Sequence, residues 1–136
     1  MSQELMKSCT LDTTTNTTAL AYIGDSVYEV YVRKHVMTGG SAHVDALHKK
    51  TVSYVRADAQ AKALKVLMKG FLSEEEMALA KRARNHKSLS KPKNADPVDY
   101  KLATAFEALI GSLYLAENKD RLEEVIRQAF KIIEEL

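Results

Sequence analysis

Apolar residues along the chain recur at spacings of three and four, which is typical of amphipathic helices. The first such pattern begins near Thr17 and ends before the Gly39-Gly40 pair, which can close a helix. Its apolar positions are Leu20, Ile23, Val27, Val30 and Tyr31. The pattern predicts one long helix over about 18–38.

Two further helical regions follow that first helix. One begins near Ser41, and the next ends at Gly70, while the pattern leaves the boundary between them open. Ser73 then stands three residues before Glu76, the spacing of a capping box. It predicts the start of a helix that reaches about Arg84.

Polar residues 85–95 interrupt the helical pattern and predict a loop. After the loop, Asp96 is suited to cap a helix and Pro97 to occupy its first turn. This helix, over about 98–117, is the most apolar of the chain. A last amphipathic helix is expected to be capped by Asp120.

Composition agrees with an all-α fold. The chain has 136 residues, enough for one domain with a core of its own, and 46% of them are hydrophobic. Five glycines and two prolines offer little of the turn chemistry that a β-sandwich or barrel needs. We therefore predict a compact bundle of about six helices, with those at 18–38 and 98–117 in the centre. Residues 1–136 would form a single domain, in which 1–16 is a flexible N-terminal segment.

The N-terminal residues carry no apolar signal core, because Lys7 and its polar neighbours interrupt any such segment. A lone cysteine, Cys9, cannot form an internal disulfide. The longest uncharged stretch near it, 13–24, is too short to span a membrane. These features predict a cytoplasmic location.

Positive charge is concentrated in residues 81–94, although the net charge of the whole chain is only +2. This segment holds six basic residues and no acid. They are Lys81, Arg82, Arg84, Lys87, Lys91 and Lys93. Such a block suits a polyanionic partner, and the alternative is a solvated loop without a partner.

Two carboxylates stand in the apolar central helices. Glu107 is the only charged residue in 103–116, and Asp25 and Glu29 are the only charged residues in 17–32. Buried carboxylates are usually paired or bound to a metal. If the two helices pack together, Asp25 and Glu107 could meet, and Gly24 and Gly111 would let the backbones approach closely.

Oxygen-only ligands at such a point suit Mg²⁺, with Mn²⁺ as a substitute, because no His or Cys stands beside the acids on those faces. The alternative is a structural ion pair with Arg or Lys, which we favour for Glu29. No Ser-His-Asp or Cys-His arrangement offers a competing nucleophile. The pattern thus indicates a metal site rather than covalent catalysis.

Two motifs in this order resemble the ribonuclease III catalytic domain. LAYIGDSVYE (20–29) is similar to the signature helix of that family, and TAFEALIGSLYL (104–115) is similar to its second acidic helix. LHKKTVSYVRADAQA (47–61) looks like its middle helix. The resemblance covers about residues 17–117.

The chain ends at Leu136, where longer members of the family continue into a double-stranded-RNA-binding domain. That length resembles the Mini-ribonuclease III subfamily, as does the basic segment 81–96. The resemblance implies a homodimeric, magnesium-dependent endoribonuclease that cleaves double-stranded RNA in maturation of the large-subunit (23S) ribosomal RNA precursor.

Residue by residue, Asp25 and Glu107 match the two acids that the family requires for catalysis and metal binding. Further acids of the longer enzymes are replaced here by Thr18, Ala21 and Thr104. RNA binding is expected from the basic segment, at Lys81, Arg82, Arg84, Asn85, Lys87, Lys91 and Lys93.

Lys49, Lys50 and Arg56 could extend the track for RNA, although for each of them taken singly we favour a solvated helix face. The rival function is a non-catalytic double-stranded-RNA or ribosome-associated helical binding protein, and the missing acids are the argument for it. The intact Asp25 and Glu107 argue against it.

Overall fold

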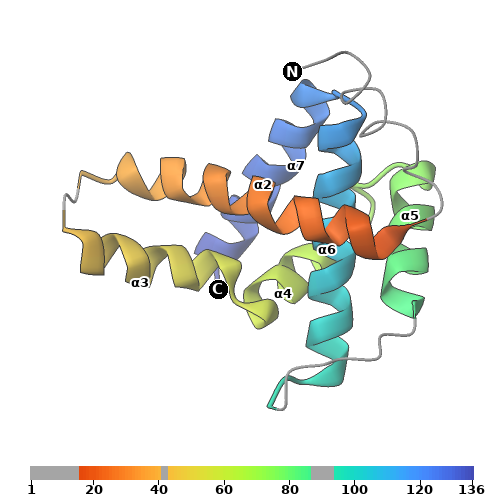
Figure 1. Cartoon of the computed structure of the whole chain (residues 1–136), viewed down its shortest axis with the longest axis horizontal. Coiled ribbons are helices and arrows are strands. Elements are labelled where there is room, and N and C mark those ends of the chain that lie inside the picture. Colours follow the sequence, from red (N-terminus) through yellow and green to blue (C-terminus); the bar gives the residue numbers. More distant parts are fainter. Residues whose placement is uncertain (1–15, 41–42, 87–93) are drawn as a thin grey trace.

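A computed structural model describes residues 16–40, 43–86 and 94–136, which form six α-helices (Figure 1). They are α2 (Thr17–Met37), α3 (Val44–Val55), α4 (Ala57–Leu67), α5 (Glu74–Asn85), α6 (Pro97–Leu115) and α7 (Lys119–Glu134). The described part of the chain contains no strand. The all-α prediction is confirmed, as is the expected number of helices.

Helices α2 and α6 cross in direct backbone contact and form the centre of the molecule (Figure 1). A Cβ atom added to Gly24 would overlap the carbonyl group of Glu107 and lie 2.9 Å from the backbone nitrogen of Gly111. A Cβ added to Gly111 would overlap the carbonyl oxygen of Leu20. The close approach predicted from the two glycines is therefore present.

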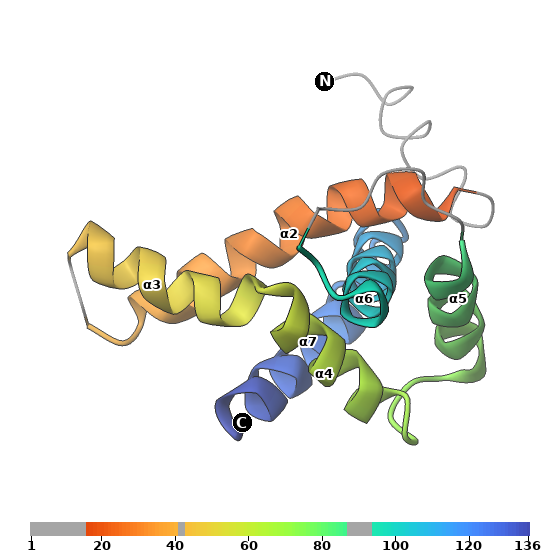
Figure 2. The same cartoon turned by 90° about the horizontal axis from the view of Figure 1, so that it is seen from below.

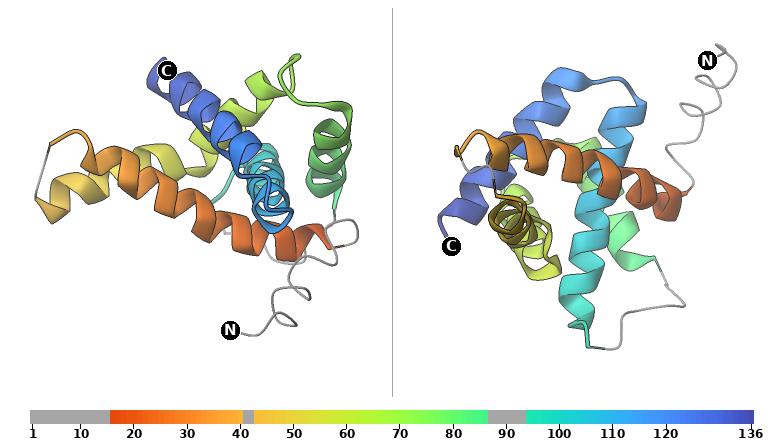
Figure 3. Two further views of the ribbon diagram at one scale, coloured as in Figure 1. Left: turned by 90° about the horizontal axis from the view of Figure 1, so that it is seen from above. Right: turned by 60° about the vertical axis from the view of Figure 1, so that its left-hand side comes forward.

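Helices α4, α5 and α7 surround α6 on the sides that α2 leaves open. Figure 2 shows α6 nearly end-on, with α2 on one side, α5 on another, and α4 and α7 opposite α2. Helix α3 runs beside the C-terminal half of α2, as the two views of Figure 3 also show. No described helix combines the length and the hydrophobicity that a membrane span requires.

Aromatic side chains fill the core beneath the helix crossing. Tyr28 and Phe106 are both 0% exposed, and their rings meet edge to face with centroids 4.9 Å apart. The Tyr28 hydroxyl donates a hydrogen bond of 3.0 Å to the backbone oxygen of Tyr54. Burial of these rings fixes α2 against α6 and against the end of α3.

Several helix boundaries follow the predicted capping chemistry. The Ser73 side chain accepts a hydrogen bond from the Glu76 backbone, and Glu76 accepts one in return from Ser73. Asp96 accepts hydrogen bonds from the backbone of Val98 and Asp99 at the start of α6. Both predicted helix starts are confirmed.

The structure places the boundary that the pattern left open between the two middle helices, and it changes one predicted cap. The segment 47–61 is not one middle helix, because the extended backbone of Arg56 (ψ 146°) separates α3 from α4. The last helix begins at Lys119, where Asn118 accepts the capping hydrogen bond from Arg121, so the prediction that Asp120 caps it was wrong. An asparagine two residues upstream offers the same oxygen acceptor as an aspartate.

Candidate active site

The carboxyl groups of Asp25 and Glu107 meet beside the crossing of α2 and α6. Glu107 is partly buried, whereas Asp25 is exposed. The pair therefore lies at the edge of the core and can be reached from solvent. Burial, the charge of Asp25 and a hydrogen bond with Asp25 together raise the pKa of Glu107 to about 8. Two acids this close repel each other when both are ionised, and the arrangement favours a proton or a cation between them.

A glutamine from a third helix holds Glu107 from the interior. Gln60 of α4 is 2% exposed, and its side-chain hydrogen bond to Glu107 lowers the pKa of that carboxyl, which opposes the effect of burial. Its Nε2 also donates to the backbone oxygen of Val55 at 2.9 Å. The buried Oε1 of Gln60 has no hydrogen-bond partner among the described residues. A buried oxygen without a hydrogen bond is energetically unfavourable. The Gln60 side chain therefore contacts Glu107 at the expense of its own Oε1.

Tyr28 completes the buried side of the site. Burial, followed by electrostatic interaction with Tyr54 and with Glu107, raises the pKa of its hydroxyl well above the ordinary range. The hydroxyl therefore stays neutral and keeps its hydrogen bond to Tyr54. Tyr28 supports the position of α2 under Asp25 rather than serving as an acid or base.

The donor set fits a hard cation. Asp25 and Glu107 offer carboxylate oxygens, and the described residues contain no group of three or more His, Cys, Asp or Glu that could hold an ion. Mg²⁺ commonly takes only one or two carboxylates and leaves its other positions to water and phosphate. The pair is thus suited to Mg²⁺ and unsuited to a closed zinc site.

The positions that carry further acids in longer ribonuclease III enzymes are differently used here. Thr104 donates its hydroxyl to the backbone oxygen of Tyr100 at 2.9 Å, within its own helix. Ala21 is 7% exposed and packs in the core. Thr18 and Thr104 line a small cleft with His86, at the end of α5.

That cleft places the start of the basic segment near the carboxylates. Thr104 lies one helical turn before Glu107 on α6, and His86 directly follows α5. Lys81, Arg82 and Asn85 are exposed, while Arg84 is partly buried. Lys87, Lys91 and Lys93 lie outside the described residues.

Other charged residues singled out in the sequence have different surroundings. Glu29 forms an ion pair with Arg33 one turn later, at 3.0 Å, as predicted for a structural role. Arg56 pairs with Asp58 at 3.2 Å. Lys49 and Lys50 are exposed on α3.

Comparison with known proteins agrees with this geometry. Residues 18–118 match the Ribonuclease III domain. The chain belongs to this family. It is an endoribonuclease of the ribonuclease III type, which goes against the non-catalytic alternative.

Relatives within the ribonuclease III family are similar over most of their length. The chain is 49% identical to the Mini-ribonuclease 3 of Brevibacillus brevis, over 88% of this chain and 89% of that protein. It is 43% identical to the Mini-ribonuclease 3 of Enterococcus faecalis, over 88% and 92% of the two chains. The crystal structure of protein FN1578 from Fusobacterium nucleatum superposes with a TM-score of 0.76 at 31% identity, over 86% of this chain and 93% of that one.

Sequence reasoning missed Gln60 and Tyr28 in this ribonuclease III site. Gln60 stands in an alanine-rich stretch, ADAQAKAL, where its amide is the one uncharged polar side chain. A polar group on the apolar face of a helix is a usable signal, but only the packing of α4 against α6 shows what it contacts.

Proposed function

We propose that this ribonuclease III domain cleaves double-stranded RNA with Mg²⁺ held by Asp25 and Glu107. The observation that carries the proposal is the hydrogen-bonded pair of carboxyl groups at the crossing of α2 and α6. A bound Mg²⁺ would supply a water of lowered pKa and positive charge for the phosphate oxygens. Mn²⁺ would serve as a substitute because it accepts the same oxygen ligands.

The protein's own contribution is to hold two carboxylates at one fixed point. Glu107 is restrained by the Gln60 amide and by its position on a helix that is packed on several sides. Asp25 is restrained by the close contact of Gly24 with α6. Rigid placement of this kind reduces the reorganisation that a reaction at the site would otherwise require.

Double-stranded RNA is proposed as the substrate because of the charge around this site. A-form RNA hides its base edges in a deep groove, so proteins recognise it through shape, phosphates and 2′-hydroxyls. Lys81 and Arg82 project from α5, whose end lies beside Thr104, one turn from Glu107. The basic segment 81–94 would then contact phosphates next to the carboxylate pair.

Two copies of the chain would place one site on each strand of a duplex. In support of a homodimer, one face of α2 carries three large apolar side chains that are each more than half exposed. Such an exposed apolar surface is typical of a protein–protein contact. They are Tyr22 at 82%, Val30 at 58% and Met37 at 63%. We further propose that residues 1–136 act as one catalytic domain in the cytoplasm, on the precursor of large-subunit (23S) ribosomal RNA.

Cleavage of a long RNA duplex, with and without Mg²⁺, tests the metal site. Asp25→Asn and Glu107→Gln keep the size of each side chain and remove its charge. Loss of several kcal/mol of transition-state stabilisation would lower the rate by about 10³-fold or more in either variant. Duplex binding and the far-UV circular dichroism spectrum should be retained.

Glu29→Gln is the matched control, since Glu29 lies on α2 one turn from Asp25 but pairs with Arg33. It should cleave at close to the wild-type rate. Near-normal turnover by Asp25→Asn or Glu107→Gln, or full activity of the wild type after chelation of metal, would contradict the proposal.

A further inference from the structure

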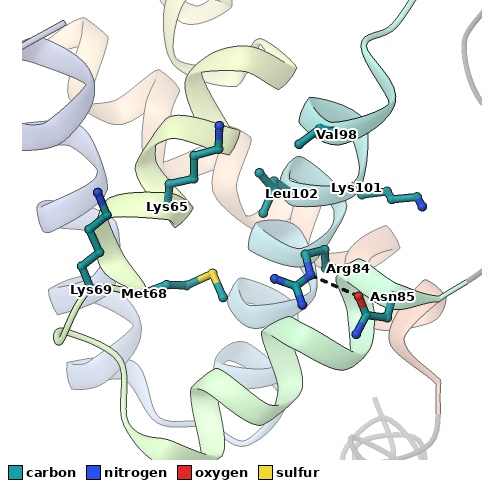
Figure 4. A pocket seen from close by; sticks show the side chains of 8 residues that line it. All are labelled: Lys65, Met68, Lys69, Arg84, Asn85, Val98, Lys101 and Leu102. Carbon is teal, nitrogen blue, oxygen red and sulfur yellow. Dashed lines mark hydrogen bonds between the residues drawn. The ribbon is translucent and has the colours of Figure 1, made fainter.

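A surface cavity of about 440 Å³, open to solvent, lies between α4, α5 and α6 (Figure 4). Its volume is in the range of small-molecule sites in proteins. Eight residues line it: Lys65, Met68, Lys69, Arg84, Asn85, Val98, Lys101 and Leu102. Four of them are cationic and none is acidic.

The cavity is distinct from the carboxylate pair. A helix turns by about 100° per residue, so Val98 and Leu102 lie about 180° and about 140° around α6 from Glu107. On α4, Lys65 lies about 140° around the helix from Gln60. A ligand in this cavity would therefore be separated from the carboxylate pair by the body of α6.

The chemistry of the lining combines an apolar surface with unneutralised positive charge. In Figure 4, Met68 and Leu102 point into the cavity from opposite sides, with Val98 beside Leu102. The Arg84 guanidinium extends into the same space, and its Nε donates to Asn85 Oδ1 at 3.2 Å. Lys65 and Lys69 stand along the α4 side, and Lys101 is directed to the outer edge.

Among the residues that the structure describes, no carboxylate forms an ion pair with these four cations. The ion pairs among the described residues involve Arg33, His35, Arg56 and Arg121 instead. Like charges around one cavity repel, and an anion placed among them removes that repulsion. An inorganic anion would make no apolar contact with Met68, Val98 and Leu102.

We propose that this cavity binds a nucleoside phosphate, with the base against Met68, Val98 and Leu102 and the phosphate near Lys65 and Lys69. The planar guanidinium of Arg84 can stack on a base, and the Asn85 amide can hydrogen-bond its edge. The ligand is either a free nucleotide or the phosphorylated end of an RNA chain. A duplex backbone presents phosphates but no free base, and the apolar surface favours a nucleotide over it.

Titration of the metal-free protein in the presence of a chelator tests this site separately from the metal site. The probes are ADP for a free nucleotide and the 5′-phosphorylated dinucleotide pApA for an RNA end, with adenosine and inorganic phosphate as the two halves. Methyl NMR signals of Met68, Val98 and Leu102 report where each probe binds. We expect ADP, pApA or both to shift these signals to saturation.

Lys65→Gln combined with Lys69→Gln should weaken that binding by about tenfold or more, because charge-assisted contacts to phosphate are lost. Val98→Ser should weaken ADP and pApA but leave inorganic phosphate unchanged; Val98 is 59% exposed, so the fold tolerates it. Lys62→Gln, an exposed lysine of α4 outside the cavity, is the matched control and should bind like the wild type. Arg84 is left unchanged because it also belongs to the basic segment.

Three results would overturn the proposal. The first is no saturation by ADP or pApA up to about 10 mM. The second is inorganic phosphate binding as tightly as ADP, with no effect of Val98→Ser, which would indicate simple charge attraction. The third is a Lys65→Gln/Lys69→Gln variant that loses binding of a long RNA duplex but still binds ADP and pApA like the wild type. That result would mean that the two lysines contact the duplex instead of a nucleotide. None of these affects the test of Asp25 and Glu107.

Discussion

Gly24 of α2 lies directly against the backbone carbonyl of Glu107, so the contact that joins the two central helices also fixes one of the two candidate metal ligands. A side chain at position 24 would have to displace backbone atoms, which cannot move aside as a flexible side chain can. Fold and site are therefore coupled at this single contact.

Gly24→Ala should lower the free energy of unfolding by about 3 kcal/mol or more, because the added methyl group would overlap backbone atoms and force the two helices apart. Urea unfolding followed by circular dichroism measures it. Gly39→Ala is the control, because its Cβ would lie 3.3 Å from the nearest atom and at an ordinary backbone angle. Equal, small effects of both substitutions would show that the helices can separate without cost.

Gln60→Leu should weaken metal binding without abolishing the fold. The leucine keeps the volume of Gln60 and removes the amide that holds Glu107. Loss of such a supporting hydrogen bond typically costs about 10- to 100-fold in metal affinity. Calorimetric titration with Mn²⁺ reads this directly, with no dependence on turnover.

Thr51→Val provides the comparison for Gln60→Leu, because Thr51 is also buried (7% exposed) but donates only to Leu47 of its own helix. It should leave Mn²⁺ affinity unchanged. A Gln60→Leu protein that binds Mn²⁺ like the wild type would mean that the amide has only a structural role.

Lys81→Gln combined with Arg82→Gln should weaken duplex binding in a salt-dependent way. Each phosphate contact contributes about 0.9 to the log–log salt slope by the B-DNA value, so the slope should flatten by up to about 2. Binding is measured in the Asp25→Asn background, where the RNA stays intact. Lys119→Gln combined with Lys131→Gln, on α7, is the charge-matched control and should keep the wild-type slope. If both double variants show the same slope, the RNA does not contact Lys81 and Arg82.

Glu76 and Arg121 should make stability depend on acidic pH. The Arg121 guanidinium donates to Glu76 at 2.7 Å, and this hydrogen bond lowers the pKa of the Glu76 carboxyl. Because the folded pKa is below the unfolded value of 4.5, the contribution is complete above about pH 4.5. It is lost as pH falls through the lower folded pKa.

Glu76→Gln should therefore cost about 1–3 kcal/mol at pH 7, and the difference from the wild type should shrink below about pH 4.5. Gln preserves the capping box, so the substitution isolates the charge. Urea unfolding at several pH values measures both effects. Glu75→Gln, at an exposed neighbouring position, should show no such pH dependence; a constant difference for Glu76→Gln would exclude the ion pair as its cause.

The helices and the identity of the two acids could be predicted from the sequence alone. These features are local, which means that each can be recognised from residues close together in the sequence. They are the periodic apolar positions, the Ser73 and Asp96 caps, and the isolated Asp25 and Glu107. The glycines at 24 and 111 even indicated where the central helices would touch. Two helical regions were predicted between 41 and 70, but the position of the break at Arg56 was not, because apolar periodicity continues on both sides of it.

Only the tertiary structure brought residues from separate helices together. Gln60 reaches Glu107 across 47 positions of sequence because α4 packs on α6. The same packing leaves the cationic cavity on the opposite side of α6, where Lys65, Arg84 and Leu102 come from three helices. Such proximity depends on how helices cross, and crossing is decided by the shapes of several side chains at once rather than by any one segment.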